Sequence, residues 1–66
     1  MALLRLYRLT VLSVDVPLNR EKIRALPDDA VAQQWARGVL QQSNTVAVRV
    51  ERSEEGQWVQ VWTDAH

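Results

Sequence analysis

PDDAVAQQWARGVLQQ, residues 27–42, is the stretch that decides the fold, because it is the one segment of the chain with a clear helical period. At about 100° per residue, its apolar and polar side chains fall on opposite halves of a helical cylinder. The apolar half consists of Val31, Ala32, Trp35, Ala36, Val39 and Leu40. Pro27 is typical of a first helical turn, and Asp28 and Asp29 complement the positive end of the helix dipole. We therefore predict one amphipathic helix, which needs a flat apolar layer to cover.

Three flanking segments have the composition of strands. Residues 3–16, LLRLYRLTVLSVDV, are rich in leucine and valine and contain neither glycine nor proline. Residues 45–52, TVAVRVER, and residues 57–63, QWVQVWT, alternate between apolar and polar side chains. Residues 53–56, SEEG, lie between these two segments and end on a glycine. We therefore predict that the last two strands form a β-hairpin.

The segment between the first strand and the helix has a different pattern. Pro17 removes a backbone donor, so we expect it to end the first strand. Asn19 is a helix-capping residue type, and we predict that it caps a short helical turn over residues 20–25. The resulting order of strand, helix, strand and strand predicts a single α+β domain over residues 1–66. One main helix packs on a three-stranded sheet in this prediction.

Apolar residues on both faces of the first strand leave two interpretations open. Either a bulge near residues 8–10 exchanges the faces, or both faces are covered because the strand is central or lies at an interface. The strand is also longer than an average strand, which suits pairing with its symmetry mate. A chain of 66 residues without cysteine has a small core and gains stability from self-association. We therefore predict that the sheets of two chains join in a homodimer.

The register of the predicted hairpin decides where two tryptophans lie, because a shift of one residue turns every side chain to the other face. A three-residue loop, residues 54–56, places Trp58 and Trp62 on the valine face, under the helix. A four-residue loop, residues 53–56, places both on the outer face. Each indole can bury about 150–250 Å², which favours the first register.

The residue types that catalysis requires do not form a recognisable constellation. Ser13, Ser43 and Ser53 have no base beside them in the sequence, and the one histidine is the last residue. The acidic pairs at residues 28–29 and 54–55 are explained by the helix dipole and by a solvated turn. The chain has no cysteine and two glycines, which argues against a zinc site and a phosphate-binding loop. We therefore predict no enzymatic activity, no cofactor and no bound metal.

Charge and hydropathy bear on location and partners. Eight basic and eight acidic residues balance, but residues 1–25 carry five basic and two acidic side chains. No run of about 18 apolar residues is present to cross a membrane. The first residues, MALLRLYRL, contain arginines and lack the cleavage site of a secretion signal. We therefore expect a cytoplasmic protein.

Two functions are consistent with these observations. The first is a small protein–protein interaction module, such as a subunit, adaptor or inhibitor, that acts as a homodimer and binds another protein. Tryptophan and arginine dominate the energetics of many interfaces, so the predicted partner-binding residues are Trp58, Trp62, Arg49 and Tyr7. The alternative is a nucleic-acid-binding dimer that uses the basic N-terminal strand. The residues that would carry it are Arg5, Arg8, Arg20, Lys22 and Arg24.

Overall fold

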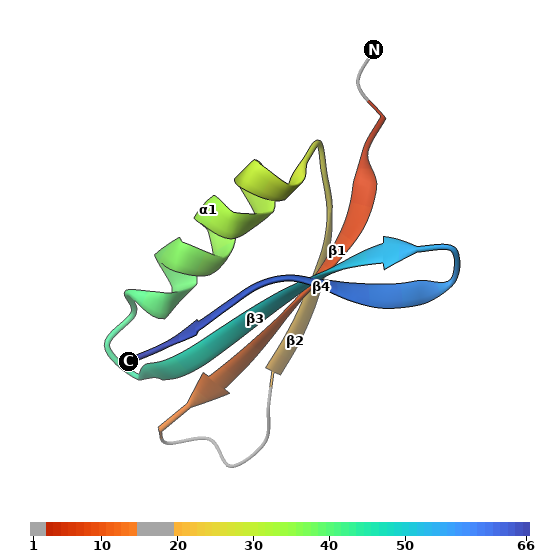
Figure 1. The fold of residues 1–66 in the computed structure, drawn as a ribbon. Coiled ribbons are helices and arrows are strands. Elements are labelled where there is room, and N and C mark those ends of the chain that lie inside the picture. Colours follow the sequence, from red (N-terminus) through yellow and green to blue (C-terminus); the bar gives the residue numbers. More distant parts are fainter. Residues whose placement is uncertain (1–2, 15–19) are drawn as a thin grey trace.

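The computed structural model describes residues 3–14 and 20–66, which form one helix and four strands in two layers. The elements in chain order are β1 (Arg5–Ser13), β2 (Arg20–Leu26), α1 (Asp29–Leu40), β3 (Thr45–Glu54) and β4 (Gln57–Ala65). The strands pair in the order β2-β1-β3-β4, and every neighbouring pair is antiparallel. α1 lies along one side of this twisted sheet (Figure 1). The α+β class predicted from the sequence is confirmed.

The sheet has four strands rather than the predicted three. Residues 20–26 form β2, where we predicted a helical turn, and they pair with β1 from Arg20 opposite Val11 to Leu26 opposite Arg5. The reason is tertiary: an extended segment here satisfies the backbone groups along an edge of β1 that would otherwise face solvent. Pro17 and Asn19, the predicted strand end and helix cap, lie outside the described residues.

β1 is a central strand, so its pairing with a symmetry mate through its edge is excluded. β2 occupies one edge of β1 and β3 occupies the other. The register is continuous from Arg5 to Leu12 and shifts only between Leu12 and Ser13, so the predicted bulge at residues 8–10 is wrong. The other interpretation is correct in part: the strand is central, but only one of its apolar faces is covered. The observed strand, residues 5–13, is also shorter than the predicted one.

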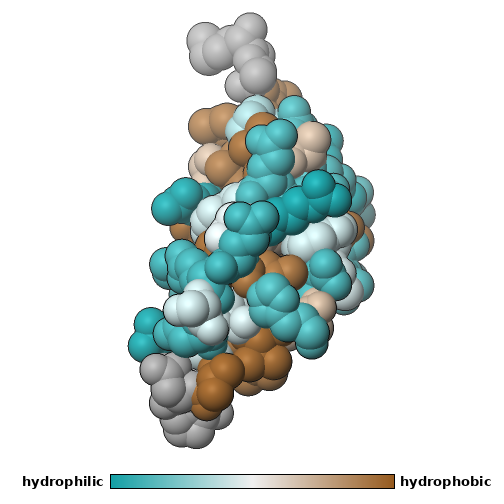
Figure 2. Space-filling view, turned by 90° about the vertical axis from the view of Figure 1, so that its left-hand side faces the viewer, coloured by the Kyte–Doolittle hydropathy of each residue, from teal (hydrophilic) through white to brown (hydrophobic). Residues whose placement is uncertain are grey.

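The predicted amphipathic helix is confirmed. The Asp28 side chain caps α1 by accepting a hydrogen bond from the backbone N–H of Val31 at 2.9 Å. α1 packs mainly against β3. The buried core comprises Tyr7, Leu9, Val11, Ala32, Ala36, Leu40, Val48 and Val50. The outward side of the helix is largely hydrophilic (Figure 2). Gly38 has open space around the position of a Cβ atom, so it is a tolerated residue rather than a close backbone contact.

A two-residue turn joins β3 to β4, so both predicted loop lengths are wrong. Glu55 and Gly56 have positive φ angles of 51° and 78°, the combination that type I′ turns require. Glu54 and Gln57, the residues on either side, already pair with each other.

A β-bulge in β4 then changes the register. Glu51 pairs with Gln60 and Val50 pairs with Trp62, so Val61 is an extra residue on β4. A bulge of this kind turns the following side chains to the other face of the sheet.

The bulge separates the two tryptophans of β4. Trp62 lies on the helix side and packs with Val61 against the core. Trp58 pairs with Ser53 and lies on the opposite face, where the Arg8 guanidinium stacks on its ring. Each predicted register placed both indoles together, and each was therefore right for one of them.

Candidate protein interface

The side of the sheet that faces away from α1 is not covered by any element of the described chain (Figure 1). We call it the open face. Strand alternation and register give its members on β1 and β3: Leu6, Arg8, Thr10, Leu12, Ala47, Arg49, Glu51 and Ser53. Its members on the outer strands are Glu21, Ile23, Ala25, Trp58, Gln60, Thr63 and Ala65.

Three large apolar side chains of the open face are exposed to solvent. Leu6 is 51% exposed, Leu12 is 41% exposed and Ile23 is 58% exposed. Leu6 pairs with Ala25 on β2, and Leu12 pairs with Ala47 on β3, so the apolar surface extends sideways across strands. Arg8 and Thr10 separate Leu6 from Leu12 along β1, so the open face carries two apolar areas with a polar band between them. Exposed apolar areas of this kind make the open face a candidate docking surface.

A pair of opposite charges lies at the centre of the open face. The guanidinium of Arg8 donates to Glu51 Oε1 from Nη2 at 2.8 Å and from Nε at 3.1 Å. The two side chains are only 23% and 12% exposed, and the guanidinium carbon of Arg8 lies 4.7 Å from the centre of the Trp58 ring. This arrangement holds the charges in a neutral, rigid unit, because both are already partnered before anything docks.

Arg49 and Glu21 are the remaining charged residues of the open face. Arg49 is 49% exposed, and its Nε lies 3.6 Å from Glu51, a long contact to a carboxylate that Arg8 already occupies. Glu21 is exposed and makes no salt bridge with a described residue. Both pair with Thr10 of β1, one from each side, so they lie in one row across the sheet.

A shallow hollow of about 210 Å³ lies beside this row. Its lining includes Thr10, Leu12, Ala47, Arg49 and Thr63. The hydroxyl of Thr63 donates to the backbone carbonyl of Val48 at 2.9 Å, whereas the buried hydroxyl of Thr10 has no partner among the described residues. The hollow therefore combines apolar side chains with polar groups, a lining that suits water as well as a partner.

The structure divides the predicted partner-binding residues between the two sides of the sheet. Trp58 and Arg49 lie on the open face, close to Arg8 and Glu51. Tyr7 is fully buried under the helix, and Trp62 is half-buried on the same side. The open face therefore brings together two of the four predicted residues.

The predicted nucleic-acid-binding residues are divided as well. Arg8 belongs to the open face. Every second residue of β2 points to the helix side, and these residues include Arg20, Lys22 and Arg24. The Arg24 guanidinium carbon lies 4.8 Å from the centre of the Trp35 ring on α1. Arg5 is also on the helix side, at a shallow pocket next to the start of α1.

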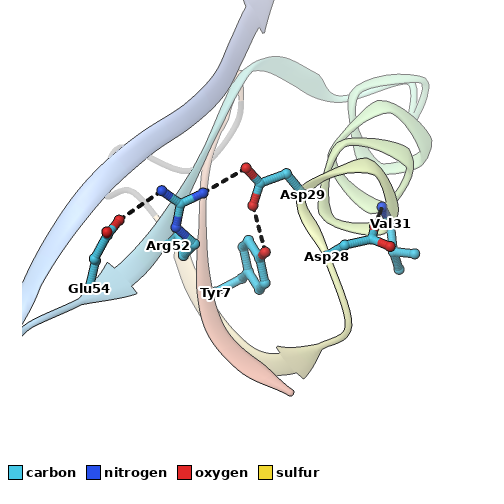
Figure 3. A network of polar contacts seen from close by, with 6 residues as sticks. All are labelled: Tyr7, Asp28, Asp29, Val31, Arg52 and Glu54. Atoms are coloured by element: carbon cyan, nitrogen blue, oxygen red, sulfur yellow. Dashed lines mark hydrogen bonds and ion pairs between the residues drawn. The ribbon is translucent and has the colours of Figure 1, made fainter. Parts of the chain in front are cut away.

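A polar network on the helix side, which runs from the buried Tyr7 to the exposed Glu54, is the other candidate for chemistry (Figure 3). Tyr7 donates its hydroxyl to Asp29 Oδ1 at 2.6 Å, and Arg52 donates to Asp29 Oδ2 at 2.6 Å. Arg52 also donates to Glu54 at 2.8 Å. These contacts join β1, the first turn of α1 and the end of β3, so the network fixes the helix to the sheet.

The pKa shifts in this network agree with a structural role. Burial, and then the hydrogen bond to Asp29, raises the pKa of Tyr7 to about 12. The hydrogen bond from Tyr7 lowers the pKa of Asp29, although partial burial opposes this. At neutral pH the phenol stays protonated and the carboxylate stays charged, so each group satisfies the other.

Within residues 3–14 and 20–66, no three histidine, cysteine or acidic side chains are grouped closely enough to hold a metal ion. In the same part of the chain, no helix has the length and apolar character needed to cross a membrane.

Sequence reasoning missed the apolar members of the open face. Ile23 falls within the predicted helical turn over residues 20–25, but it lies exposed on β2. Leu6 and Leu12 carried a signal, since one helix covers only one face of a strand that is apolar on both faces.

Comparisons of the chain with protein-family models, with curated proteins and with solved structures find no match.

Proposed function

We propose that this chain is a small protein–protein interaction module that has no catalytic role and acts as a homodimer. The observation that supports the proposal is the open face itself, where Leu6, Leu12 and Ile23 are each more than two-fifths exposed. The sheet has one helix for two faces, so a second surface is needed to bury the apolar residues on the uncovered side.

The size of the open face fits a small dimer interface. Four strands of seven to ten residues, spaced about 4.8 Å apart with about 3.3 Å per residue, give a footprint of roughly 500 Å². Two such faces bury about 1,000 Å², the lower limit of specific interfaces. We therefore expect a reversible dimer rather than a permanent one.

The alternative, pairing through a sheet edge, is disfavoured by charge. An antiparallel pair of β2 strands from two copies would place the cations of Arg20, Lys22 and Arg24 opposite one another, because paired residues share a face. Charged side chains on an edge strand protect it from such pairing. The open face is therefore the surface that we assign to self-association.

Sedimentation of matched variants tests this proposal. Ile23→Glu places a charge in the open face, and we expect it to shift the chain to monomer at micromolar concentration. Val59→Glu is the control, since Val59 is 40% exposed but pairs with Arg52 on the helix side. A wild-type chain that sediments as a monomer, or a Val59→Glu chain that dissociates as readily as Ile23→Glu, contradicts the proposal.

A second candidate function rests on the cations of β2. Arg20, Lys22 and Arg24 form a row on one side of the strand and make no salt bridge with a described residue. Alternate residues of a strand are about 6.6 Å apart, and such a row suits contact with the backbone of a nucleic acid.

Retention on an oligonucleotide column tests the second candidate. If it is correct, retention falls steeply with salt, and it is weaker for Lys22→Gln than for wild type. Arg49→Gln, on the opposite face, leaves retention unchanged. Absence of retention at low salt contradicts this candidate.

A further inference from the structure

We infer that the open face binds a second copy of this chain around a two-fold axis that runs along β1, so that Arg49 of each copy meets Glu21 of the other. This inference rests on the proposed function, and it adds the geometry of the contact. It follows from three features of the open face: the row of charges, the position of the leucines and the total charge.

The charge row supplies the specific contact. Glu21 and Arg49 are both in register with Thr10, so they lie on opposite sides of β1 and at the same height along it. The proposed half-turn is about an axis parallel to β1, midway between the two facing sheets. It exchanges the β2 side with the β3 side and leaves the position along β1 unchanged. Each Arg49 is then placed over the partner's Glu21, and the two-fold symmetry repeats the ion pair.

The leucines of β1 supply the apolar contact. Leu6 and Leu12 lie on the axis itself, above and below Thr10 along the strand, so each meets its own symmetry mate. Arg8 also lies on β1, between Leu6 and Thr10, but its guanidinium leans away from the axis, onto Glu51 of β3 and the Trp58 ring of β4. The leucines therefore meet at the axis, while the charged groups lie to its sides.

The charge of the open face also permits self-association. Its four charged residues, Arg8, Glu21, Arg49 and Glu51, carry equal numbers of positive and negative charges. Arg8 and Glu51 neutralise each other within one copy at 2.8 Å. A surface without net charge approaches its own copy without long-range repulsion, and the two outer charges select the relative orientation.

A charge exchange between Glu21 and Arg49 tests the geometry. Glu21→Arg gives a chain with two positive residues in the row, and Arg49→Glu gives a chain with two negative residues. Each variant alone has two like-charge contacts in place of two ion pairs, and we expect its dimer dissociation constant to rise roughly 10- to 50-fold. An equimolar mixture of the two variants restores both ion pairs, so we expect a heterodimer within about threefold of the wild-type affinity.

The control is a variant with the same total charge and a different location. Arg37→Glu changes a cation on the exposed side of α1, remote from the open face. A mixture of Arg37→Glu with Glu21→Arg has the same net charges as the test mixture, but its heterodimer has one ion pair and one like-charge contact. We expect the affinity of this heterodimer to lie between those of the two homodimers and below that of the test heterodimer, and we expect Arg37→Glu alone to dimerise as the wild type does. Circular dichroism of every variant separates dissociation from unfolding.

The outcomes distinguish this inference from the proposed function. The axis along β1 is wrong if the wild type dimerises and neither charge reversal weakens the dimer. It is also wrong if the control mixture associates as tightly as the test mixture. Neither result contradicts the dimer itself. A wild-type monomer overturns both. Selective recovery in the mixture of Glu21→Arg with Arg49→Glu supports the proposed geometry.

Discussion

Removal of one oxygen atom, by Tyr7→Phe, tests how the helix is fixed to the sheet. The phenol of Tyr7 is fully buried and donates to Asp29 at 2.6 Å. A hydrogen bond to a charged group contributes about 1.5–3 kcal/mol to stability. The Asp29 side chain is 48% exposed and keeps its bond from Arg52, so water replaces part of what the phenol supplied. We therefore expect a loss of about 1–2 kcal/mol in the free energy of unfolding, which lowers the melting temperature of so small a domain by roughly 5–15 °C.

The pH dependence of the same variant gives an independent test. The pKa of Asp29 is lowered in the folded state, mainly by the bond from Tyr7. A lowered pKa adds stability at pH values above the unfolded pKa of the carboxyl group, and this stability is lost as the pH falls through the folded pKa. The wild-type chain therefore loses stability below about pH 4, the usual range of an aspartate, and Tyr7→Phe loses less there.

In the alkaline range, the contribution of Tyr7 to stability falls as the pH rises. The folded pKa of Tyr7 is raised to about 12 from an ordinary value of 10.0, so the buried phenol adds stability below pH 10 that is lost as the pH rises toward 12. Tyr7→Phe lacks this contribution. Urea unfolding followed by circular dichroism between acid and alkaline pH measures both effects. If Tyr7→Phe matches the wild type within about 0.5 kcal/mol and has the same acid dependence, the anchoring role is wrong.

Three further substitutions test local features of the fold by thermal unfolding. Gly38→Ala places a methyl group in open space within a helix, so we expect a gain of about 0.5–1 kcal/mol, and a loss would show an unrecognised contact. Asp28→Ala removes the acceptor for Val31 N–H and is expected to cost about 1 kcal/mol, whereas an unchanged stability would show that the cap is dispensable. Gly56→Ala forces a methyl group onto a residue at φ 78°, and we expect a cost of about 1 kcal/mol from backbone strain alone, since no atom lies within 4 Å of the new methyl group.

The helix and the two hairpin strands were predictable because their patterns depend on local residues. The period of residues 27–42 requires only a core to face, and Asp28 and Asp29 lie at the start of the helix, as the dipole argument predicted. β2 was not predictable in the same way. Its apolar residues are few, and its stability as a strand comes from pairing with β1, which the sequence of residues 20–26 does not encode.

The membership of the open face depended on features that the sequence pattern does not show. One extra residue, Val61, decides that Trp62 lies under the helix and that Trp58 lies outside, and a bulge has no clear sequence signature. Misassignment of β2 also hid Ile23 and Glu21, which belong to the open face only when the segment is a strand. Trp58 and Arg49 could be selected because both residue types are common in interfaces.

The proposed dimer contact through the open face is tested most directly by a dilution series of amide NMR spectra of the whole chain. Association through the open face predicts concentration-dependent shifts at amides of β1 and of its neighbours β2 and β3, including Thr10, Ile23 and Arg49, while amides along the exposed side of α1 stay unchanged. Shifts concentrated on α1, or spectra that do not change between micromolar and millimolar concentration and report a monomer throughout, would contradict it.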